Sequence, residues 1–522
     1  MLKADLIHSC EMILGRNDIV FFIYYEKSIM NEGAMQKACS LALCLLTVAF
    51  FLLVLFADFI PMQVGSYAAQ RFFILGFLGF FVVFSLGFLI YRDGFRWLVD
   101  IFPAAMLSVG FILLSLPFCK IAFAWVEPGM YALFFLGFVL AGRLPRQWVQ
   151  KERWLTILVG VAAITSAFYG ASTFTVYLFA MSDSVANLST YIPWGFVSIR
   201  YWGHIATWLL PLLPLAVLVG PLQKQRLWRL SVAIGAALWW WIVFLSSSRG
   251  TMLGVAFGVF LAAVLIGRPA VPWLKVFFKY LVYGVIAWFL LSVLIPSVLL
   301  DEVSMRTLKS DTSGRMPLFI EAWRMSLIEF PLGLGPQSWL THEIITEGYR
   351  KSPKFGHPHN MYLMWAAEYG WLLMVGLLVL AAQAVRLFWR RRNELVHDDT
   401  KALPLAAFTA SVSAALLHAG VSAVLMAPGS MLIGFLVLSV FWALISDDSV
   451  TSTNKPTTKR TIVALAVALA GGLLCLTWLK EVRAYHSAMI VDEVFYYENV
   501  PMGTLPRFWL HGNFPRHESQ MP

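Results

Sequence analysis

Apolar runs of about 20 residues recur along most of this 522-residue chain, and each run is long enough to cross roughly 30 Å of hydrocarbon as a helix. Only 13% of the residues are charged, against about 25% in soluble globular proteins. The runs lack the period-two alternation of a membrane β-barrel, and a helix satisfies its own backbone hydrogen bonds in lipid. We therefore expect an all-α, polytopic integral membrane helix bundle.

The runs predict about thirteen spans, of which the fourth is the shortest. They cover residues 39–59, 71–91, 103–119, 129–142, 154–179, 203–220, 229–246, 251–267, 275–298, 361–388, 403–425, 428–446 and 461–479. This divides the chain into an N-terminal segment (1–38), spans 1–9 (39–298), a large polar loop (299–360), spans 10–13 (361–479) and a tail (480–522).

Basic residues in the short loops indicate the orientation in the membrane. Alternate loops contain 20 Lys and Arg residues, whereas the opposite short loops contain four. Because cytoplasmic loops are enriched in these residues, we expect the N-terminus in the cytoplasm and the 299–360 loop and the tail on the outer face. The net charge of +10 then reflects topology and does not indicate nucleic-acid binding.

Neither a cleaved signal peptide nor a cofactor site is indicated. The first 38 residues lack a basic segment followed by a short apolar core and a cleavage site. The five cysteines lack the spacing of metal ligands and do not form a disulfide framework. We therefore predict no cofactor and no metal.

The first polar cluster lies in the turn Ser246-Ser247-Ser248-Arg249-Gly250-Thr251 between two spans. Ser247 or Ser248 is expected to cap the following helix, whose free N–H groups would then lie beside Arg249 and favour an anion. The alternative is that Arg249 is a boundary arginine whose head group reaches the membrane surface.

A second cluster begins at Thr312-Ser313-Gly314-Arg315. We predict that Ser313 caps a helix that has Pro317 in its first turn, with Arg315 at its start above an apolar stripe. The glycines of the following segment, 331–335, permit positive φ or close backbone approach. The alternative is a surface helix with an exposed arginine.

The third cluster, His357-Pro358-His359-Asn360, directly precedes a span. Pro358 favours an extended His357, and Asn360 is a good helix cap, so we expect His359 at the mouth of the span, where it can accept a proton from a hydroxyl group. Glu368, two turns further along, is a carboxylate within a span that requires a partner and is a candidate for substrate binding or for bracing the fold.

Arg200 and His204 form a weaker fourth cluster at the outer end of the sixth predicted span. They lie one helical turn apart, so both can add positive charge to one cavity. The nearby Trp202 is explained by the aromatic belt of membrane proteins alone.

Three segments together resemble the O-antigen ligase and polymerase superfamily of bacterial inner-membrane glycosyltransferases. They are SSSRGTMLG (246–254), SGRMPLFIEAWRMSLIEFPLGLG (313–335) and HPHNMYLMWAAEYG (357–370). The resemblance covers roughly residues 190–440 and implies a GT-C-like fold with a periplasmic active site. Arg249 and Arg315 resemble the arginines that bind the donor's diphosphate, and His359 resembles the residue proposed to activate the acceptor hydroxyl.

The implied donor is an undecaprenyl diphosphate-linked glycan. The implied acceptor is lipid A core in ligases, another lipid-linked repeat unit in polymerases, or a protein hydroxyl in protein O-oligosaccharyltransferases. The short tail favours the ligase branch. A transporter of anions or lipid-linked sugars is a different class, which would place its essential charges near the middle of the membrane. Arg200, His204, His357, Asn360 and Glu368 are the further residues that we expect to bind substrate.

Overall fold

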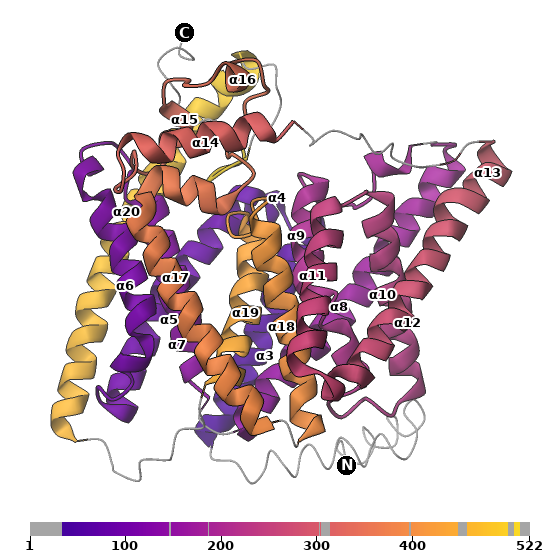
Figure 1. Cartoon of the computed structure of the whole chain (residues 1–522), viewed down its shortest axis with the longest axis horizontal. Coiled ribbons are helices and arrows are strands. Elements are labelled where there is room, and N and C mark those ends of the chain that lie inside the picture. The colour runs from indigo at the N-terminus through magenta and orange to yellow at the C-terminus, as the bar shows by residue number, and fades with distance from the viewer. Residues whose placement is uncertain are drawn as a thin grey trace, which may run out of the picture.

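The computed structural model is a helical bundle whose long helices run roughly side by side (Figure 1). It describes residues 34–145, 148–185, 187–301, 303, 314–395, 398–446, 457–499 and 506–511. Within these ranges, eleven helices are long and apolar enough to cross a membrane. The predicted all-α, multi-pass membrane architecture is thus confirmed.

Twelve of the thirteen predicted spans correspond to helices that cover most of the expected residues. These are α3 (Ala34–Leu55), α5 (Tyr67–Asp93), α6 (Leu98–Ser115), α7 (Val126–Arg143), α8 (Trp148–Ser182), α10 (Arg226–Leu245), α11 (Arg249–Ile266), α12 (Val271–Trp288), α17 (Met361–Leu395), α18 (Asp399–Ala419), α19 (Pro428–Ile445) and α20 (Thr458–Asn499). The span of α12 is prolonged by a π-turn, Phe289–Leu294, and by α13 (Ile295–Leu300).

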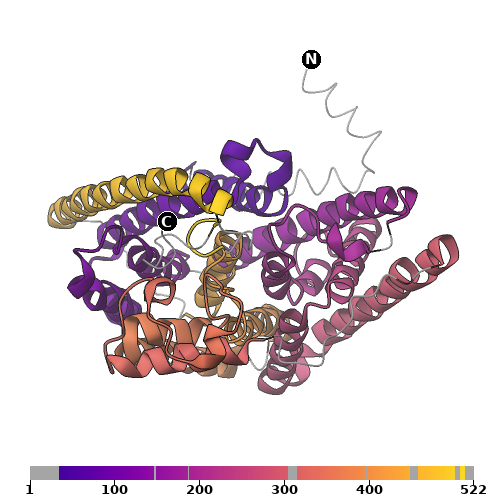
Figure 2. The ribbon, with the colours of Figure 1, turned by 90° about the horizontal axis from the view of Figure 1, so that it is seen from above.

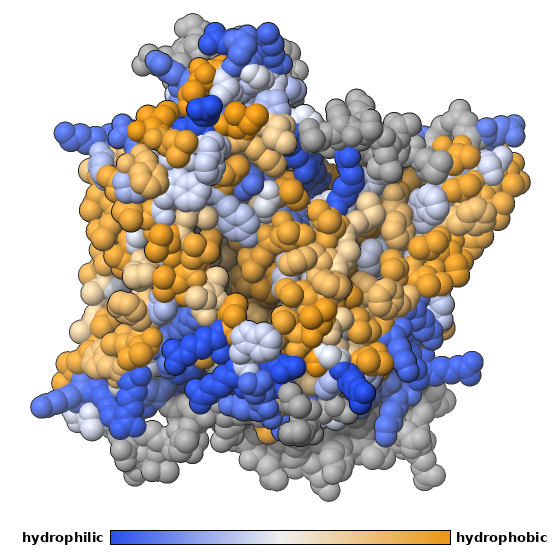
Figure 3. All heavy atoms as spheres, in the orientation of Figure 1, coloured by the Kyte–Doolittle hydropathy of each residue, from blue (hydrophilic) through white to orange (hydrophobic). Residues whose placement is uncertain are grey.

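Hydrophobic side chains form a broad band across the middle of the bundle, with hydrophilic residues above and below it (Figure 3). The short helices α14 (Met316–Ile328), α15 (Ser338–Thr341) and α16 (Glu347–Arg350) lie beyond this band at one end of the bundle (Figure 1). We refer to this end as the α14 end. Such a band is the surface expected of helices that face lipid.

The prediction of a continuous sixth span over residues 203–220 is wrong. Helix α9 (Ile199–Leu209) ends after 11 residues, and a short 3-10 turn, Leu213–Val217, follows. Pro211 and Pro214 explain the break, because proline lacks a backbone N–H and disfavours helix in the residue before it. Non-helical backbone is tolerated here because Leu209 to Ala216 are buried within the protein.

Helix α19 lies at the centre of the bundle, and helix α20 joins the last span to the tail. Helix α19 is buried along its whole apolar length and packs against α7, α9 and α18. Helix α20 runs along α5 (Figure 2) and continues across the predicted boundary at residues 479/480 as one 42-residue helix. The last span and most of the described tail are therefore a single element.

The glycines of segment 331–335 make the close backbone approach that the sequence predicts. Gly333 and Gly335 have φ of 82° and 97°, and their turn packs against a kink in α17 at Gly370. A Cβ at Gly370 would lie 2.1 Å from the carbonyl oxygen of Pro331. The backbone N–H groups of Leu334 and Gly335 donate to the carbonyl oxygens of Ala367 and Glu368, so the turn satisfies carbonyls that the kink leaves free.

Candidate functional site

A cavity of about 180 Å³ lies among α9, the segment before α17, the α18–α19 connection and the C-terminal segment. We call it the histidine cavity. Its lining residues are Val197, Ser198, Arg200, Tyr201, His204, Phe355, Gly356, His357, His359, Ser422 and Pro506. Four of the predicted site residues, namely Arg200, His204, His357 and His359, are thus brought to one cavity from segments more than 150 residues apart in the sequence.

His359 is held in an unusual backbone conformation next to the start of α17. Its φ is 58°, in the left-handed region that few residues other than glycine adopt. Asn360 follows it and accepts a hydrogen bond from the Leu363 N–H at 3.0 Å through its side chain. The predicted cap is therefore present, and Asn360 orients the helix start without itself lining the cavity. Strained backbone of this kind is concentrated at functional sites.

The hydrogen bonds around His357 and His359 determine their tautomers. The His359 N–H donates to Nδ1 of His357 at 3.1 Å, so Nδ1 of His357 carries no proton. Nη1 of Arg200 lies 3.1 Å from Nε2 of His359, and because a guanidinium group can only donate, Nε2 is the acceptor. The proton of a neutral His359 is therefore on Nδ1.

Both rings stay neutral near pH 7. Burial lowers the pKa of His357 to about 3, with the positive charges of Arg200, Arg507 and Arg315 adding to the effect. The pKa of His359 is also lowered well below its usual value. Burial is the largest cause, and the charges of His357, Arg200 and Arg315 contribute less. A neutral imidazole has a lone pair available, which is the state that a general base requires.

Arg315 occupies the N-cap position of α14. Its Nη1 donates to the carbonyl oxygen of Val421 at 2.8 Å, whereas its buried Nε has no hydrogen-bond partner. Among the described residues, it forms no salt bridge. Burial, which has the largest effect, and the charges of Arg200 and Arg249 together lower the pKa of Arg315 to about 10, so it is charged at neutral pH. The predicted cap, Ser313, lies outside the described residues.

Arg249 is the first residue of α11 and is exposed. Its charge is one of those that lower the pKa of Arg315, so the two predicted arginines, which are 66 positions apart in the sequence, interact electrostatically. Ser248 takes the expected N-cap position but makes no capping hydrogen bond, because its Oγ pairs with Oγ of Ser246 at 2.7 Å. The prediction of a serine side-chain cap is wrong in that respect.

His204, which lines the cavity, contacts a histidine that the sequence analysis missed, His418 of α18. Nε2 of His204 is 2.7 Å from Oγ of Ser422, and the two histidine rings meet edge to face at 5.1 Å. Nδ1 of His418 is 2.8 Å from Oγ1 of Thr207. A polar residue within an apolar span is a candidate for function, and this signal could have identified His418.

Glu368 does not line the histidine cavity. Its buried carboxylate accepts hydrogen bonds from Nη2 of Arg507 at 2.6 and 2.8 Å and from the Trp339 N–H at 3.2 Å. The expectation that Glu368 needs a partner is met by a residue of the tail. Its position supports the bracing alternative rather than contact with substrate.

Arg507 connects this carboxylate to two other parts of the molecule. It is fully buried, it forms a second salt bridge with Glu127 of α7 at 3.2 Å, and its Nη1 donates to the carbonyl oxygen of Gly356 at 3.2 Å. We call Arg507, Glu127 and Glu368 the arginine clamp. Because Gly356 immediately precedes His357, the clamp fixes the backbone that leads into the histidine cavity.

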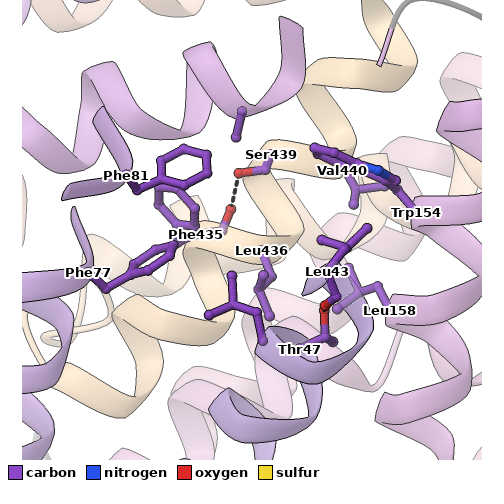
Figure 4. Close-up of a pocket in the computed structure, with 12 residues that line it drawn as sticks. Leu43, Thr47, Phe77, Phe81, Trp154, Leu158, Phe435, Leu436, Ser439 and Val440 are labelled. Atoms are coloured by element: carbon purple, nitrogen blue, oxygen red, sulfur yellow. Dashed lines mark hydrogen bonds between the residues drawn. The ribbon is translucent and has the colours of Figure 1, made fainter. Parts of the chain in front are cut away.

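Another cavity, of about 40 Å³, lies among α3, α5, α7, α8 and α19 (Figure 4). Its lining is mainly apolar, and Oγ of Ser439 donates to the carbonyl oxygen of Phe435 at 2.6 Å. It contains no charged side chain. This cavity is therefore a gap in side-chain packing and offers no groups for catalysis.

A family model described as O-antigen ligase matches residues 231–378. The matched segment contains Arg249, Arg315 and His359. Comparison with the curated proteins and with the solved structures gives no match.

Proposed function

We propose that this protein is a glycosyltransferase that moves a glycan from undecaprenyl diphosphate to a hydroxyl group of lipid A core. The match of residues 231–378 to a family model described as O-antigen ligase supports this proposal. The α14 end faces the periplasm, the N-terminus lies in the cytoplasm, and the membrane is the bacterial inner membrane. The reaction uses no metal.

The observation that carries the proposal is a neutral His359 in a cavity that Arg200 also lines. Nε2 of His359 accepts a hydrogen bond from Arg200, and Arg315 lies close enough to lower the histidine's pKa. A general base and cationic groups are the two elements that transfer from a diphosphate requires, because the acceptor must lose a proton and the leaving group gains negative charge.

In the proposed step, the acceptor oxygen forms a bond to the anomeric carbon of the donor glycan. The bond between that carbon and the diphosphate oxygen breaks, and its electron pair stays on the diphosphate. The diphosphate draws Arg200 away from His359, so Nε2 accepts the hydroxyl proton and later releases it to water. A base of this kind contributes about 10²- to 10⁴-fold to the rate.

Arg315, Arg249 and Arg200 stabilise the charge that develops on the diphosphate. A guanidinium group offers two parallel N–H donors that match phosphate oxygens, which a lysine ammonium cannot reproduce. The partnerless Nε of Arg315 supports this role, since a buried donor without an acceptor is costly unless a ligand completes it.

Deletion of the gene tests the proposal against its closest alternatives. We expect undecaprenyl diphosphate-linked polymer to persist while long lipopolysaccharide bands disappear. Lipopolysaccharide that keeps single-unit bands would instead identify a polymerase. Loss of a glycan mass from a protein, with normal lipopolysaccharide, would identify a protein O-oligosaccharyltransferase. Vesicles that accumulate substrate without any glycan transfer would identify a transporter.

A further inference from the structure

A larger cavity, of about 400 Å³, adjoins the histidine cavity and shares Val197 and Tyr201 with it. We call it the aromatic cavity. Its lining includes the aromatic residues Tyr67, Tyr191, Trp194 and Tyr201 and the polar residues Asp58 and Gln70. Its volume falls within the roughly 300–1,000 Å³ of small-molecule sites.

Aromatic side chains supply much of the wall. Tyr191 is 51% exposed, and Trp194 is half-buried with its ring 5.0 Å from that of Phe59. The carbonyl oxygen of Trp194 accepts a hydrogen bond from the Tyr169 hydroxyl at 2.8 Å. These contacts hold the Trp194 loop in place, so its ring is a preformed surface for a flat apolar ligand face.

Hydrogen-bond acceptors face the same space. Nε2 of Gln70 donates to the carbonyl oxygens of Leu53 and Gly65 at 3.1 Å each, which uses both amide hydrogens. Its Oε1, on the other side of the amide, lies towards Gly429. The exposed carboxylate of Asp58 forms no salt bridge among the described residues. At Gly195, where φ is 79°, a Cβ would lie 3.4 Å from this carboxylate.

The charge of the lining distinguishes the two cavities. Arg200 lines the histidine cavity, whereas Asp58 is the one charged residue among those that line the aromatic cavity. A carboxylate repels phosphate but accepts hydrogen bonds from hydroxyl groups, so Asp58 disfavours the diphosphate as the occupant. A lipid tail would bury Asp58 and Gln70 without hydrogen-bond partners, which is unfavourable. A pyranose ring has an apolar C–H face and a rim of hydroxyl groups, so it matches both the aromatic and the acceptor groups.

From these features we infer that the aromatic cavity is a carbohydrate subsite, which holds sugar rings of the glycan next to the reacting centre. The inference rests on the proposed transfer reaction and adds where the sugar rings bind. The same chemistry fits the donor's glycan and the acceptor's core oligosaccharide, so the two sources are distinguished by experiment.

The test measures binding separately from transfer. Full-length His359→Asn protein in detergent is titrated calorimetrically with two probes: the oligosaccharide released from the strain's own lipid-linked glycan by mild acid, and deacylated core oligosaccharide from its lipopolysaccharide. We expect one probe to bind, and Tyr191→Ala or Asp58→Asn to weaken its binding about tenfold. The probe that binds identifies the source.

Matched controls lie outside the cavity. Tyr91→Ala removes a tyrosine of similar exposure, 42%, and Asp183→Asn removes an exposed aspartate; both are expected to leave binding unchanged. Gly195→Ala, which directs a methyl group towards Asp58, is expected to weaken it. The subsite is refuted if neither probe binds, or if the cavity variants bind the probe as tightly as the control variants do. Glycan transfer by the wild type would not change that conclusion. Binding without any transfer by the wild type would refute the proposed function alone.

Discussion

The histidine cavity and the arginine clamp both involve arginines, but only the clamp pairs its arginine with carboxylates. In the clamp, Arg507 is fully buried and meets two carboxylates, those of Glu127 and Glu368. Arg315, which does not line the cavity itself, has a buried Nε without a partner, and the charges of Arg200 and Arg249 lower its pKa. A satisfied buried ion pair braces a fold, whereas clustered cations are costly and are expected where an anion binds.

The comparison predicts the largest effect at His359. Replacement by Asn, which tolerates the left-handed backbone, or by Ala should lower the transfer rate about 10²- to 10⁴-fold. Thermal unfolding of the purified His359→Asn protein should change little, and the donor should still bind. Transfer is measured with purified protein and lipid-linked donor. An Asn variant with near-normal turnover would remove the base role from His359.

The opposite pattern is expected at Arg507. Arg507→Met leaves two buried carboxylates without their cation, which should cost about 3–5 kcal/mol of stability. Thermal unfolding in detergent should detect a clear fall in melting temperature, while the transfer rate per folded molecule falls less than in His359→Asn. A melting temperature equal to that of the wild type would show that the clamp does not brace the fold.

Arg315→Lys sharpens the comparison, because it keeps the charge but loses the paired donors. We expect about a 10- to 100-fold loss of transfer with an unchanged melting temperature. Arg324→Lys is the matched control, since Arg324 is an exposed residue of the same helix. Equal activity in the two variants would exclude Arg315 from the site.

A smaller effect concerns pH. The pKa of His357 is about 3 in the folded protein and about 6.5 in an unfolded chain. Between these values the unfolded chain binds a proton that the folded protein does not, so stability should fall as pH falls below about 6.5, by up to about 1.4 kcal/mol per pH unit. Melting temperatures at pH 7 and pH 5 should therefore differ less in His357→Asn than in the wild type. Equal differences would contradict the buried, neutral His357.

Removal of divalent metal ions by chelation is expected to leave the transfer rate unchanged. In the proposed reaction, arginine side chains take the part that a metal ion plays in many diphosphate-dependent enzymes, so transfer after exhaustive treatment with EDTA should equal that before it. Activity that is lost and then restored by a divalent cation would require a metal in the mechanism.

Local sequence signals predicted much of this arrangement. Most spans follow from apolar runs, and the Asn360 cap and the close approach of the 331–335 turn follow from the residue types at those positions. The end of α9 at Leu209 was missed because the high hydropathy of residues 203–220 favoured a continuous helix, although two prolines in this segment indicate a break. The Arg507–Glu368 pair joins residues 139 positions apart, and no local pattern indicates such a contact. His418 lies within an apolar span, which is a local signal that was overlooked, but its partner Thr207 on another helix could not be predicted from the sequence.

The most direct test of the central claim is glycan transfer in proteoliposomes that contain the purified protein, undecaprenyl diphosphate-linked glycan and lipid A core. We predict that the wild type produces lipid A core bearing the glycan and releases one undecaprenyl diphosphate for each glycan transferred. His359→Asn should produce neither. Lipid A core that remains unmodified, while the donor stays intact or its glycan is joined to a second donor molecule, would contradict the account.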